Sequence, residues 1–329
     1  MSNTNKLEYI SQIRVLSLFM IVFYHCICFY LGRWGLPCAD KVTPLWSVIA
    51  PSMVNIGLTN YVLISGFLYS YLYRKGKYHN LLSFIKGKTL RLLIPYFVWS
   101  LFIIYLIPGS GQRLSGMLYG INHLWFLLMM FELFLIVSIA NVGSLLESSS
   151  KNVDVLIFAL SFFPVFFTKY ILDSHYPLAL ELTMKYLPVF LLGYYIAKYS
   201  ILERMSSLLK GSLLIVGGGI LCILTSNDID LNSEWFAFAS ALVGLSLMAM
   251  VKSCSLSVSF VSWLDASCMG IYLLNQIVIY YLLLNDGFRH WANQHEYIGP
   301  LVIFVISFGL PLLMTKLLGN FKWSRYIIG

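Results

Sequence analysis

Long apolar runs, separated by short polar or glycine-rich breaks, follow one another along the whole chain. A membrane-spanning helix needs about 20 mostly apolar residues. The segments that approach this length are 13–31, 48–72, 91–107, 123–143, 154–171, 185–199, 212–226, 236–251, 265–284 and 300–318. No polar stretch between them is long enough to fold by itself. The pattern predicts an all-α polytopic membrane protein with about ten transmembrane helices in a single domain over residues 1–329.

The composition supports this prediction. Charged residues are 11% of the 329, hydrophobic residues are 59%, and the mean hydropathy is +0.79. An ordinary soluble domain has about 25% charged residues. So few charges cannot cover a water-exposed surface, so we expect the lipid bilayer to surround most of the chain.

The positions of the basic residues predict the orientation. The net charge of +8 could indicate nucleic-acid binding, but the basic residues cluster at one set of loops, as they do in membrane proteins. With the N-terminus inside, 16 of the 22 lysines and arginines fall in predicted cytoplasmic segments and six fall outside. Such an excess sets the orientation of membrane proteins. We therefore expect both termini in the cytoplasm and no nucleic-acid partner.

The six cysteines show no spacing typical of a zinc site or a disulfide framework. Most lie in or beside apolar segments, and Cys26 and Cys28 are two positions apart, which turns them to different sides of a helix. We interpret the cysteines as small buried apolar residues and expect no metal.

Two ionisable residues of the first predicted helix share one face. Arg14 and His25 are eleven positions apart, which places them within about 20° of each other and about 16 Å apart along the axis. Ionisable groups inside a span are functional hypotheses by default. Arg14 could bind an anionic ligand near the cytoplasm, and His25, deeper in the membrane, could be a general base. The alternative is a snorkelling arginine and a histidine bonded to a neighbouring helix.

The segment 78–90 is amphipathic and basic, and it could lie along the cytoplasmic surface before the third span. Lys88 and Arg91 are three positions apart and therefore neighbours on a helix, and such a pair suits phosphate groups. Ordinary positive charge on the cytoplasmic side is the alternative explanation.

Three residues of the fourth predicted helix are further candidates. His123 could contact a ligand or lie at the interface, and Trp125 by itself is typical of the interfacial aromatic belt. Glu132 lies about 180° around the helix from His123. We expect Glu132 to pair with another helix or to carry a proton.

Other polar residues leave packing and function open. Asn55, Asn60 and the pair Ser65-Gly66 give the second helix a polar, small-residue face, which suits tight packing or the lining of a cavity. Gln276 and Asn275 in the ninth helix leave the same alternatives.

Taken together, these segments resemble the acyltransferase-3 family of integral membrane acyltransferases, and the resemblance runs through most of the chain. Arg14, ten intervening residues and His25 look like the Arg-x10-His motif of the family. The other segments that resemble family motifs are, in order, Ser65–Leu68, Lys88–Tyr96, His123–Leu127, Leu192–Tyr194 and Gly270–Leu274. Each segment is a weak signal, but their order and spacing together are specific.

The chain departs from the family pattern at several positions. Val15 replaces the usual glycine, and Ser11 and Gln12 stand where an acidic residue is usual. Lys88 replaces an arginine, which keeps the charge but loses the bidentate fork. Asn275 stands where many relatives carry a histidine, so the role of that histidine cannot be assigned here.

The resemblance implies an enzyme with ten helices in a bacterial cytoplasmic (inner) membrane, and it leaves room for a homo-oligomer. Such an enzyme takes an acyl group, usually acetyl, from cytoplasmic acyl-CoA and transfers it to a hydroxyl of a cell-surface or lipid-linked polysaccharide. Acetyl-CoA or another acyl-CoA is the co-substrate, with no metal. Arg14, Lys88 and Arg91 would bind the phosphates of the donor. His25 would be the catalytic residue, which deprotonates the acceptor hydroxyl or carries the acyl group.

The acceptor side would include His123, Trp125 and Glu132 as substrate-binding residues.

Two other functions stay open. A polysaccharide exporter or flippase would use the same polar cavity without covalent chemistry, although the absence of a visible internal repeat weakens a transporter built from inverted halves. A purely structural partner in a glycan assembly complex would leave the His25 motif unexplained.

Overall fold

The computed structural model describes residues 8–32, 37–78, 80–107, 112–147, 150–170, 178–227, 229–230, 233–254 and 259–328. Within these ranges all regular structure is helical. The α-helices are α1 (Glu8–Ile27), α2 (Pro44–Tyr73), α3 (Leu81–Lys88), α4 (Ile94–Leu106), α5 (Trp125–Val142), α6 (Lys151–Leu160), α7 (Phe163–Tyr170), α8 (Leu180–Lys198), α9 (Ile201–Arg204), α10 (Ser207–Ser226), α11 (Glu234–Cys254), α12 (Ser259–Asp265), α13 (Cys268–Leu284), α14 (Asp286–Gln294) and α15 (Gly299–Leu318).

The chain forms two compact units, and each unit is discontinuous in sequence. The first contains Met1–Tyr61, Phe102–Gln112 and Ser206–Gly329, and the second contains Val62–Leu101 and Arg113–Met205. The chain passes between the units within α2 and within α4. The sequence alone gives no sign of this division, and the expected single domain over 1–329 stays a prediction.

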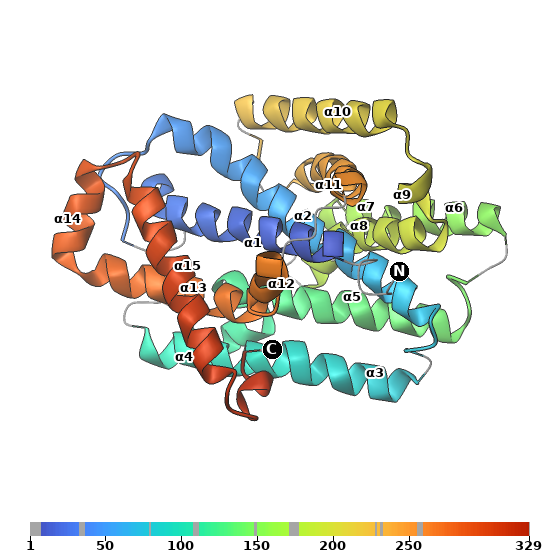
Figure 1. Ribbon diagram of the computed structural model, residues 1–329, viewed down its shortest axis with the longest axis horizontal. Helices are drawn as coiled ribbons and strands as arrows, with labels where there is room; N and C mark the ends of the chain where they lie inside the picture. Colours follow the sequence, from blue (N-terminus) through green and yellow to red (C-terminus); the bar gives the residue numbers. More distant parts are fainter. Residues whose placement is uncertain are drawn as a thin grey trace. The chain divides into compact units, whose positions relative to one another are not determined.

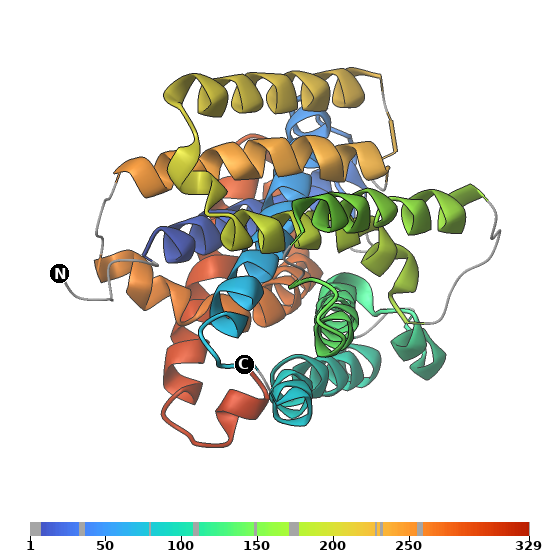
Figure 2. The ribbon, with the colours of Figure 1, turned by 90° about the vertical axis from the view of Figure 1, so that its right-hand side faces the viewer.

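The first unit is built around the N-terminal helix. The helices that pack against α1 are α11, α12, α13 and α15, and Figure 1 shows these elements. α10 packs along α11, and Figure 2 shows the two running side by side. Most of α1 is buried, with Ile13, Val22 and Ile27 at 0% exposure. A helix that is apolar around most of its circumference is expected to lie inside a bundle, and α1 does so.

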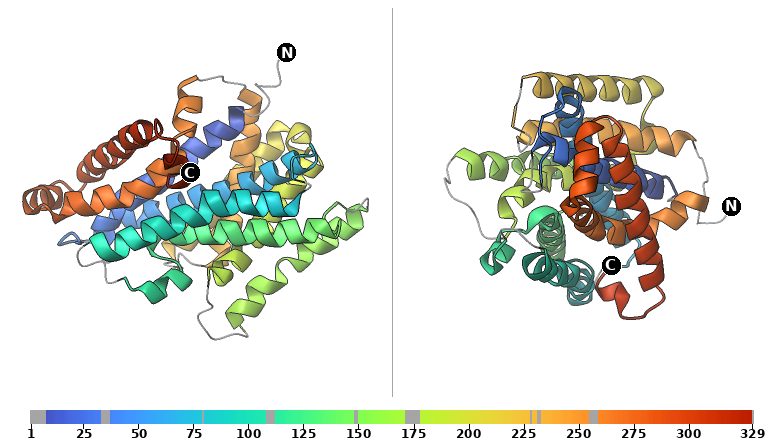
Figure 3. Two further views of the ribbon diagram at one scale, coloured as in Figure 1. Left: turned by 90° about the horizontal axis from the view of Figure 1, so that it is seen from below. Right: turned by 90° about the vertical axis from the view of Figure 1, so that its left-hand side faces the viewer.

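The second unit is built around α5 and α8. α3 and the π-helical segment that follows it lie along α5, as Figure 3 shows for the long α3–α4 rod. α6 and α7 pack on α8. At one end, the Lys198 ammonium of α8 donates to the Asp154 carboxylate of α6 over 2.5 Å, and both side chains are buried. This buried ion pair joins one end of α8 to the first turn of α6.

Fewer helices pass as membrane spans than the pattern predicts. In the described part of the chain, seven helices are long and apolar enough to cross a membrane, or eight if α12 and α13 are counted as one span. The all-helical membrane class is confirmed. The predicted count of ten and the cytoplasmic position of both termini stay predictions.

The differences in count have local causes. The expected span 154–171 is two short helices, α6 and α7, because Pro164 has no N–H with which to continue α6; residue 171 lies outside the described residues. The expected span 185–199 lies in α8, which has 19 residues but is not among the candidate spans and carries three charges, Glu181, Lys185 and Lys198.

The third predicted helix is one continuous rod. Residues 81–106 run without interruption through α3, the π-helical segment Thr89–Leu93 and α4. Pro95 lacks an N–H, so the α-helical bond that it would make is missing, and the Ile94 N–H bonds to the Thr89 carbonyl instead. From Leu81 onward, the predicted surface segment 78–90 is therefore continuous with the helix of the third span. His79 lies outside the described residues.

Candidate functional site

The face of α1 that carries Arg14 and His25 meets the broken helix α12–α13. α12 and α13 are bent by 64° at the turn Ala266–Ser267. Arg14 pairs with Asp265 at the end of α12, and His25 pairs with Asn275 within α13. Both residues of the sequence motif therefore have partners on the same pair of helices. The shared face is confirmed, and its polar partners come from the other end of the chain.

The His25 imidazole is buried and fixed in orientation. Its Nδ1 lies 2.5 Å from Oδ1 of Asn275, and the two residues are 3% and 0% exposed. The Asn275 Nδ2 donates to the carbonyls of Ile271 at 3.0 Å and Tyr272 at 2.5 Å. Those two bonds point the NH2 group toward its own helix and leave the amide oxygen to face His25.

This arrangement selects a tautomer. A carbonyl oxygen only accepts, so Nδ1 of His25 must carry the proton and donate it to Asn275. In the neutral ring the lone pair then lies on Nε2, the nitrogen that can accept a proton from a substrate. A hydrogen bond on one ring nitrogen is the usual way in which proteins set the chemistry of the other.

Arg14 is engaged in an ion pair. Its guanidinium contacts the Asp265 carboxylate, which also accepts a hydrogen bond of 2.8 Å from the Ser11 hydroxyl. The side chains of Arg14 and Asp265 are 30% and 12% exposed. The pair therefore ties α1 to α12, and a ligand phosphate that binds Arg14 has to share the guanidinium with Asp265.

Asp265 is not among the candidates predicted from the sequence. The residue stands at the predicted start of the ninth span, where an acidic group can be taken for a residue at the membrane surface. The available clue was that Asp265 is an ionisable residue within a predicted span, and such residues usually have a charged partner or belong to a functional site. Asn275 was recognised as a departure from the family, but its contact with His25 depends on packing between residues 250 positions apart.

Lys88 lies among aromatic rings in the second unit. Its ammonium is 3.5 Å from the ring centroid of Phe134 on α5 and 5.4 Å from that of Phe84. Such cation–π contacts hold a half-buried lysine in place while leaving its N–H groups to donate. Lys88 is the last residue of α3, at the start of the π-helical segment. Segments of this type occur frequently at functional sites.

Arg91 is an exposed residue of the same π-helical segment. It lies close enough to Tyr78 to affect the phenol. Burial raises the pKa of the Tyr78 phenol, and the positive charge of Arg91 partly opposes the rise. Lys88 and Arg91 thus lie in the first half of the helical rod 81–106, with an aromatic group beside each.

His123 is buried just before α5, at 5% exposure. The loop that leads to it needs two residues with positive φ, Gly120 at 94° and Asn122 at 44°. A Cβ on Gly120 would lie 2.5 Å from the Cβ of Trp125, so the loop packs directly on the tryptophan. Asparagine tolerates the left-handed conformation better than most residues. The turn therefore directs His123 inward and covers Trp125.

Glu132 joins α5 to the start of α8. Its carboxylate accepts from the Thr183 hydroxyl at 2.6 Å and from the Ala179 backbone N–H at 3.0 Å. The second bond satisfies a donor at the helix start, and a carboxylate there also interacts favourably with the helix dipole. The expected pairing of Glu132 with another helix is confirmed. Its role in substrate binding stays a prediction.

Two of the family-like segments owe their glycines to packing. A Cβ on Gly66 of α2 would lie 1.9 Å from the Phe190 carbonyl oxygen, and a Cβ on Gly193 of α8 would lie 2.0 Å from the Leu63 carbonyl oxygen. The backbones of α2 and α8 therefore touch at this crossing, as small residues allow in membrane helices. The simpler interpretation of Ser65-Gly66, tight packing, is confirmed for Gly66.

Asn55 and Asn60, the other polar candidates of α2, differ in their hydrogen bonding. Asn55 donates to the Pro51 carbonyl of its own helix at 3.0 Å. Asn60 is 0% exposed, and neither its amide nitrogen nor its oxygen has a hydrogen-bond partner among the described residues. A buried amide of this kind needs an explanation, such as a bound ligand or water.

The cysteines and acidic residues show no metal cluster. In the described ranges no group of three or more His, Cys, Asp or Glu side chains could hold a metal ion. Three cysteines are buried as expected, whereas the interpretation is wrong for the three that are exposed, namely Cys38, Cys222 and Cys254.

The candidate residues divide between the two units. Arg14 and His25 belong to the first unit, with Asp265 and Asn275. The candidates in the second unit are Lys88, Arg91, His123, Trp125 and Glu132.

Comparison with known proteins gives one match. A family model described as an acyltransferase domain matches residues 7–319 of the chain. A search of the curated proteins and a search of the solved structures returned no match. The matched range contains every candidate residue, together with Asp265 and Asn275.

Proposed function

The chain belongs to the acyltransferase-3 family, and on this premise we propose that it is a membrane O-acyltransferase. The donor is a cytoplasmic acyl-CoA, most commonly acetyl-CoA. The acceptor is a hydroxyl of a cell-surface or lipid-linked polysaccharide, and the enzyme works in the bacterial cytoplasmic membrane. Its helices that can cross a membrane support a membrane enzyme, and the family supports acyl transfer.

The observation that carries the proposal is the hydrogen bond between His25 and Asn275. The bond holds a buried imidazole with its proton on Nδ1 and its lone pair on Nε2. In the proposed step, Nε2 removes the proton of the acceptor hydroxyl while the oxygen attacks the thioester carbonyl carbon. The C–O ester bond forms and the C–S bond breaks. The departing thiolate of coenzyme A then takes the proton that His25 holds.

Asn275 is a positioning residue in this scheme. The imidazole becomes positively charged when it takes the proton, and a hydrogen bond to a charged group is stronger than one to a neutral group. The Asn275 oxygen therefore stabilises the protonated ring while keeping it in the orientation that presents Nε2.

The basic residues bind the donor in this proposal. Lys88 and Arg91 supply N–H groups for its phosphates, and the aromatic contacts of Lys88 keep its ammonium in place. Arg14 contributes the donors that its pairing with Asp265 leaves available. Lys88→Gln is expected to raise the Michaelis constant for acyl-CoA, and an unchanged constant would remove Lys88 from the donor site.

We propose that His123, Trp125 and Glu132 bind the acceptor. His123 and Trp125 are held by the turn at Gly120 and Asn122, and Glu132 is fixed by α8. Rigid support of this kind suits substrate-binding residues, because their positions are set before the substrate arrives.

Label transfer in isolated membranes tests the proposal. Membranes that contain equal amounts of the parent protein, His25→Ala or His290→Ala receive labelled acetyl-CoA and surface glycan precursors. His290 is an exposed histidine on α14 and serves as the matched control. We expect alkali-labile label in the glycan with the parent and the control, and none with His25→Ala. Glycan export without any labelled ester in the parent would favour an exporter instead.

A further inference from the structure

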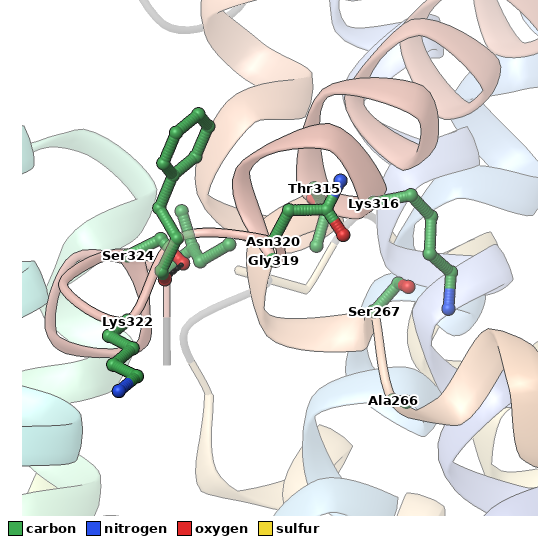
Figure 4. A pocket seen from close by; sticks show the side chains of 10 residues that line it. Ala266, Ser267, Thr315, Lys316, Gly319, Asn320, Lys322 and Ser324 are labelled. Carbon is green, nitrogen blue, oxygen red and sulfur yellow. Dashed lines mark hydrogen bonds between the residues drawn. The ribbon is translucent and has the colours of Figure 1, made fainter.

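A cavity of about 480 Å³ lies in the first unit, at the bend between α12 and α13. It is lined by Ala266 and Ser267 of the bend, by Thr315 and Lys316 of α15, and by the segment that follows α15. Figure 4 shows these side chains, with Lys316 extending from α15 beside the turn that holds Ser267. The volume lies in the range of small-molecule sites. No role in the acyl transfer step is assigned to this cavity.

Ser267 lies at the start of α13 but does not make the hydrogen bond that a serine usually makes there. It occupies the N-cap position of α13, but its φ and ψ of −109° and −2° lie outside the extended conformation that a capping serine adopts. Its side chain makes no cap hydrogen bond, and its hydroxyl has no partner among the described residues although the residue is 1% exposed. A buried hydroxyl at a cavity wall that bonds to none of the described residues is a donor that a bound ligand can use.

The charges around the cavity favour an anion. The start of the 17-residue helix α13 carries a partial positive charge, and Lys316 and Lys322 add two full charges. The Lys316 ammonium donates to the Trp263 carbonyl at 3.0 Å, and an ammonium has two further N–H groups for a ligand. The opposing negative end of α15 is largely compensated, because the carbonyls of Thr315, Leu317 and Leu318 already accept backbone hydrogen bonds. The nearby carboxylate of Asp265 is paired with Arg14.

We propose that this cavity binds a phosphate group, with Ser267 and Lys316 as its ligands. A hydroxyl, an ammonium group and a helix start form the kind of donor set that recognises phosphate in many proteins. The phosphate belongs either to the acyl donor, coenzyme A, or to the headgroup of an anionic phospholipid. The first source rests on the proposed function, whereas the second does not.

Direct binding with two probes distinguishes the sources. The parent, Ser267→Ala, Lys316→Gln and Lys210→Gln are purified in nanodiscs of phosphatidylcholine and titrated with coenzyme A. The same proteins are then compared for the gain in thermal midpoint when phosphatidylglycerol is included in the nanodisc. Lys210 is the matched control, because it is a lysine of the same unit whose ammonium bonds to Ser253 rather than lining the cavity.

A hydrogen bond to a charged group typically changes affinity by about tenfold or more. We therefore expect Ser267→Ala and Lys316→Gln to weaken coenzyme A binding by about tenfold, or to abolish the gain from phosphatidylglycerol, with Lys210→Gln unchanged in both. The first result identifies the donor as the source, and the second identifies the lipid. Ser267→Ala removes one oxygen atom, so it guards against loss of the fold in the lysine variant.

Two results overturn the inference: binding of neither probe by the parent, or parental binding of both probes by the two cavity variants. The inference and the proposed function fail separately. Binding that depends on Ser267, without any acyl transfer, would support the phosphate site and refute the proposed enzymatic activity. Acyl transfer, together with probe binding that the cavity variants do not change, would support the enzymatic activity and refute the phosphate site.

Discussion

The bond between His25 and Asn275 gives the most specific prediction of the account. Asn275→Leu replaces the amide with an apolar side chain of similar shape and leaves Nδ1 of His25 without its acceptor. The bond is 2.5 Å long and fully buried, and its donor becomes charged during the reaction. Hydrogen bonds to charged groups contribute about 1.5–3 kcal/mol. At about 1.4 kcal/mol per factor of ten, kcat should fall by roughly 10- to 150-fold.

The loss should be specific to the chemical step. Asn275 does not belong to the residues assigned to the donor or the acceptor, so the Michaelis constant for acyl-CoA should stay near the parental value. Asn275→Asp keeps an oxygen at the position of Oδ1, and in its protonated form it can still donate to the Ile271 or Tyr272 carbonyl, so it should retain more activity than Asn275→Leu. A purely structural role would not produce this order together with an unchanged Michaelis constant.

Initial rates of acyl transfer by the purified variants provide the assay, with protein amounts matched by quantitative blotting. Asn55→Leu is the control, because Asn55 is a buried amide whose bond is made to its own helix at Pro51. Parental kcat in Asn275→Leu would refute the tautomer argument. An equal loss in Asn275→Leu and Asn55→Leu would show that the loss comes from general destabilisation.

Three further predictions concern stability and binding. Gly66→Ala should lower the inactivation temperature in detergent by about 1–4 °C, because the helices must separate by roughly 1–1.5 Å and overpacking of this kind costs about 1–3 kcal/mol. Gly218→Ala, whose added Cβ meets nothing within 4 Å, should leave that temperature unchanged. Asp265→Asn should destabilise the protein by roughly 1–3 kcal/mol, measured by heat inactivation, because it leaves Arg14 without its carboxylate. Glu132→Gln keeps the shape but weakens two hydrogen bonds, so it should lower heat stability and should raise the Michaelis constant for the glycan if Glu132 binds the acceptor.

Each of these predictions has a contrary outcome. Equal inactivation temperatures for Gly66→Ala and Gly218→Ala would mean that α2 and α8 do not touch at the crossing. A parental heat stability in Asp265→Asn would make the ion pair energetically irrelevant. A glycan Michaelis constant that does not change in Glu132→Gln would limit Glu132 to its structural bonds with α8.

Helical periodicity predicted which residues share a face of a single helix. Arg14 and His25 share a face because their separation is set by helix geometry alone, and the structure confirms that face. The membrane class follows equally directly, because apolar length and scarce charge are properties of the sequence itself. The span 154–171 was wrong as one helix, and Pro164 within it was the available signal.

Packing between distant segments could not be predicted in the same way. The contacts of Arg14 with Asp265 and of His25 with Asn275 join residues about 250 positions apart. No periodicity connects such residues. The crossing at Gly66 and Gly193 likewise depends on how α2 and α8 meet, so the sequence offered only small residues of uncertain purpose. The division into two discontinuous units depends on many such contacts and leaves no mark on the hydropathy pattern.

Glycan-dependent release of coenzyme A tests the central claim most directly. The purified protein in nanodiscs receives acetyl-CoA with and without the acceptor glycan, and the free thiol is measured for the parent and for His25→Ala. The account predicts thiol release by the parent only when glycan is present, and none above background with His25→Ala. Glycan-dependent release at the parental rate by His25→Ala would contradict the assignment of His25 as the base on which the transfer depends.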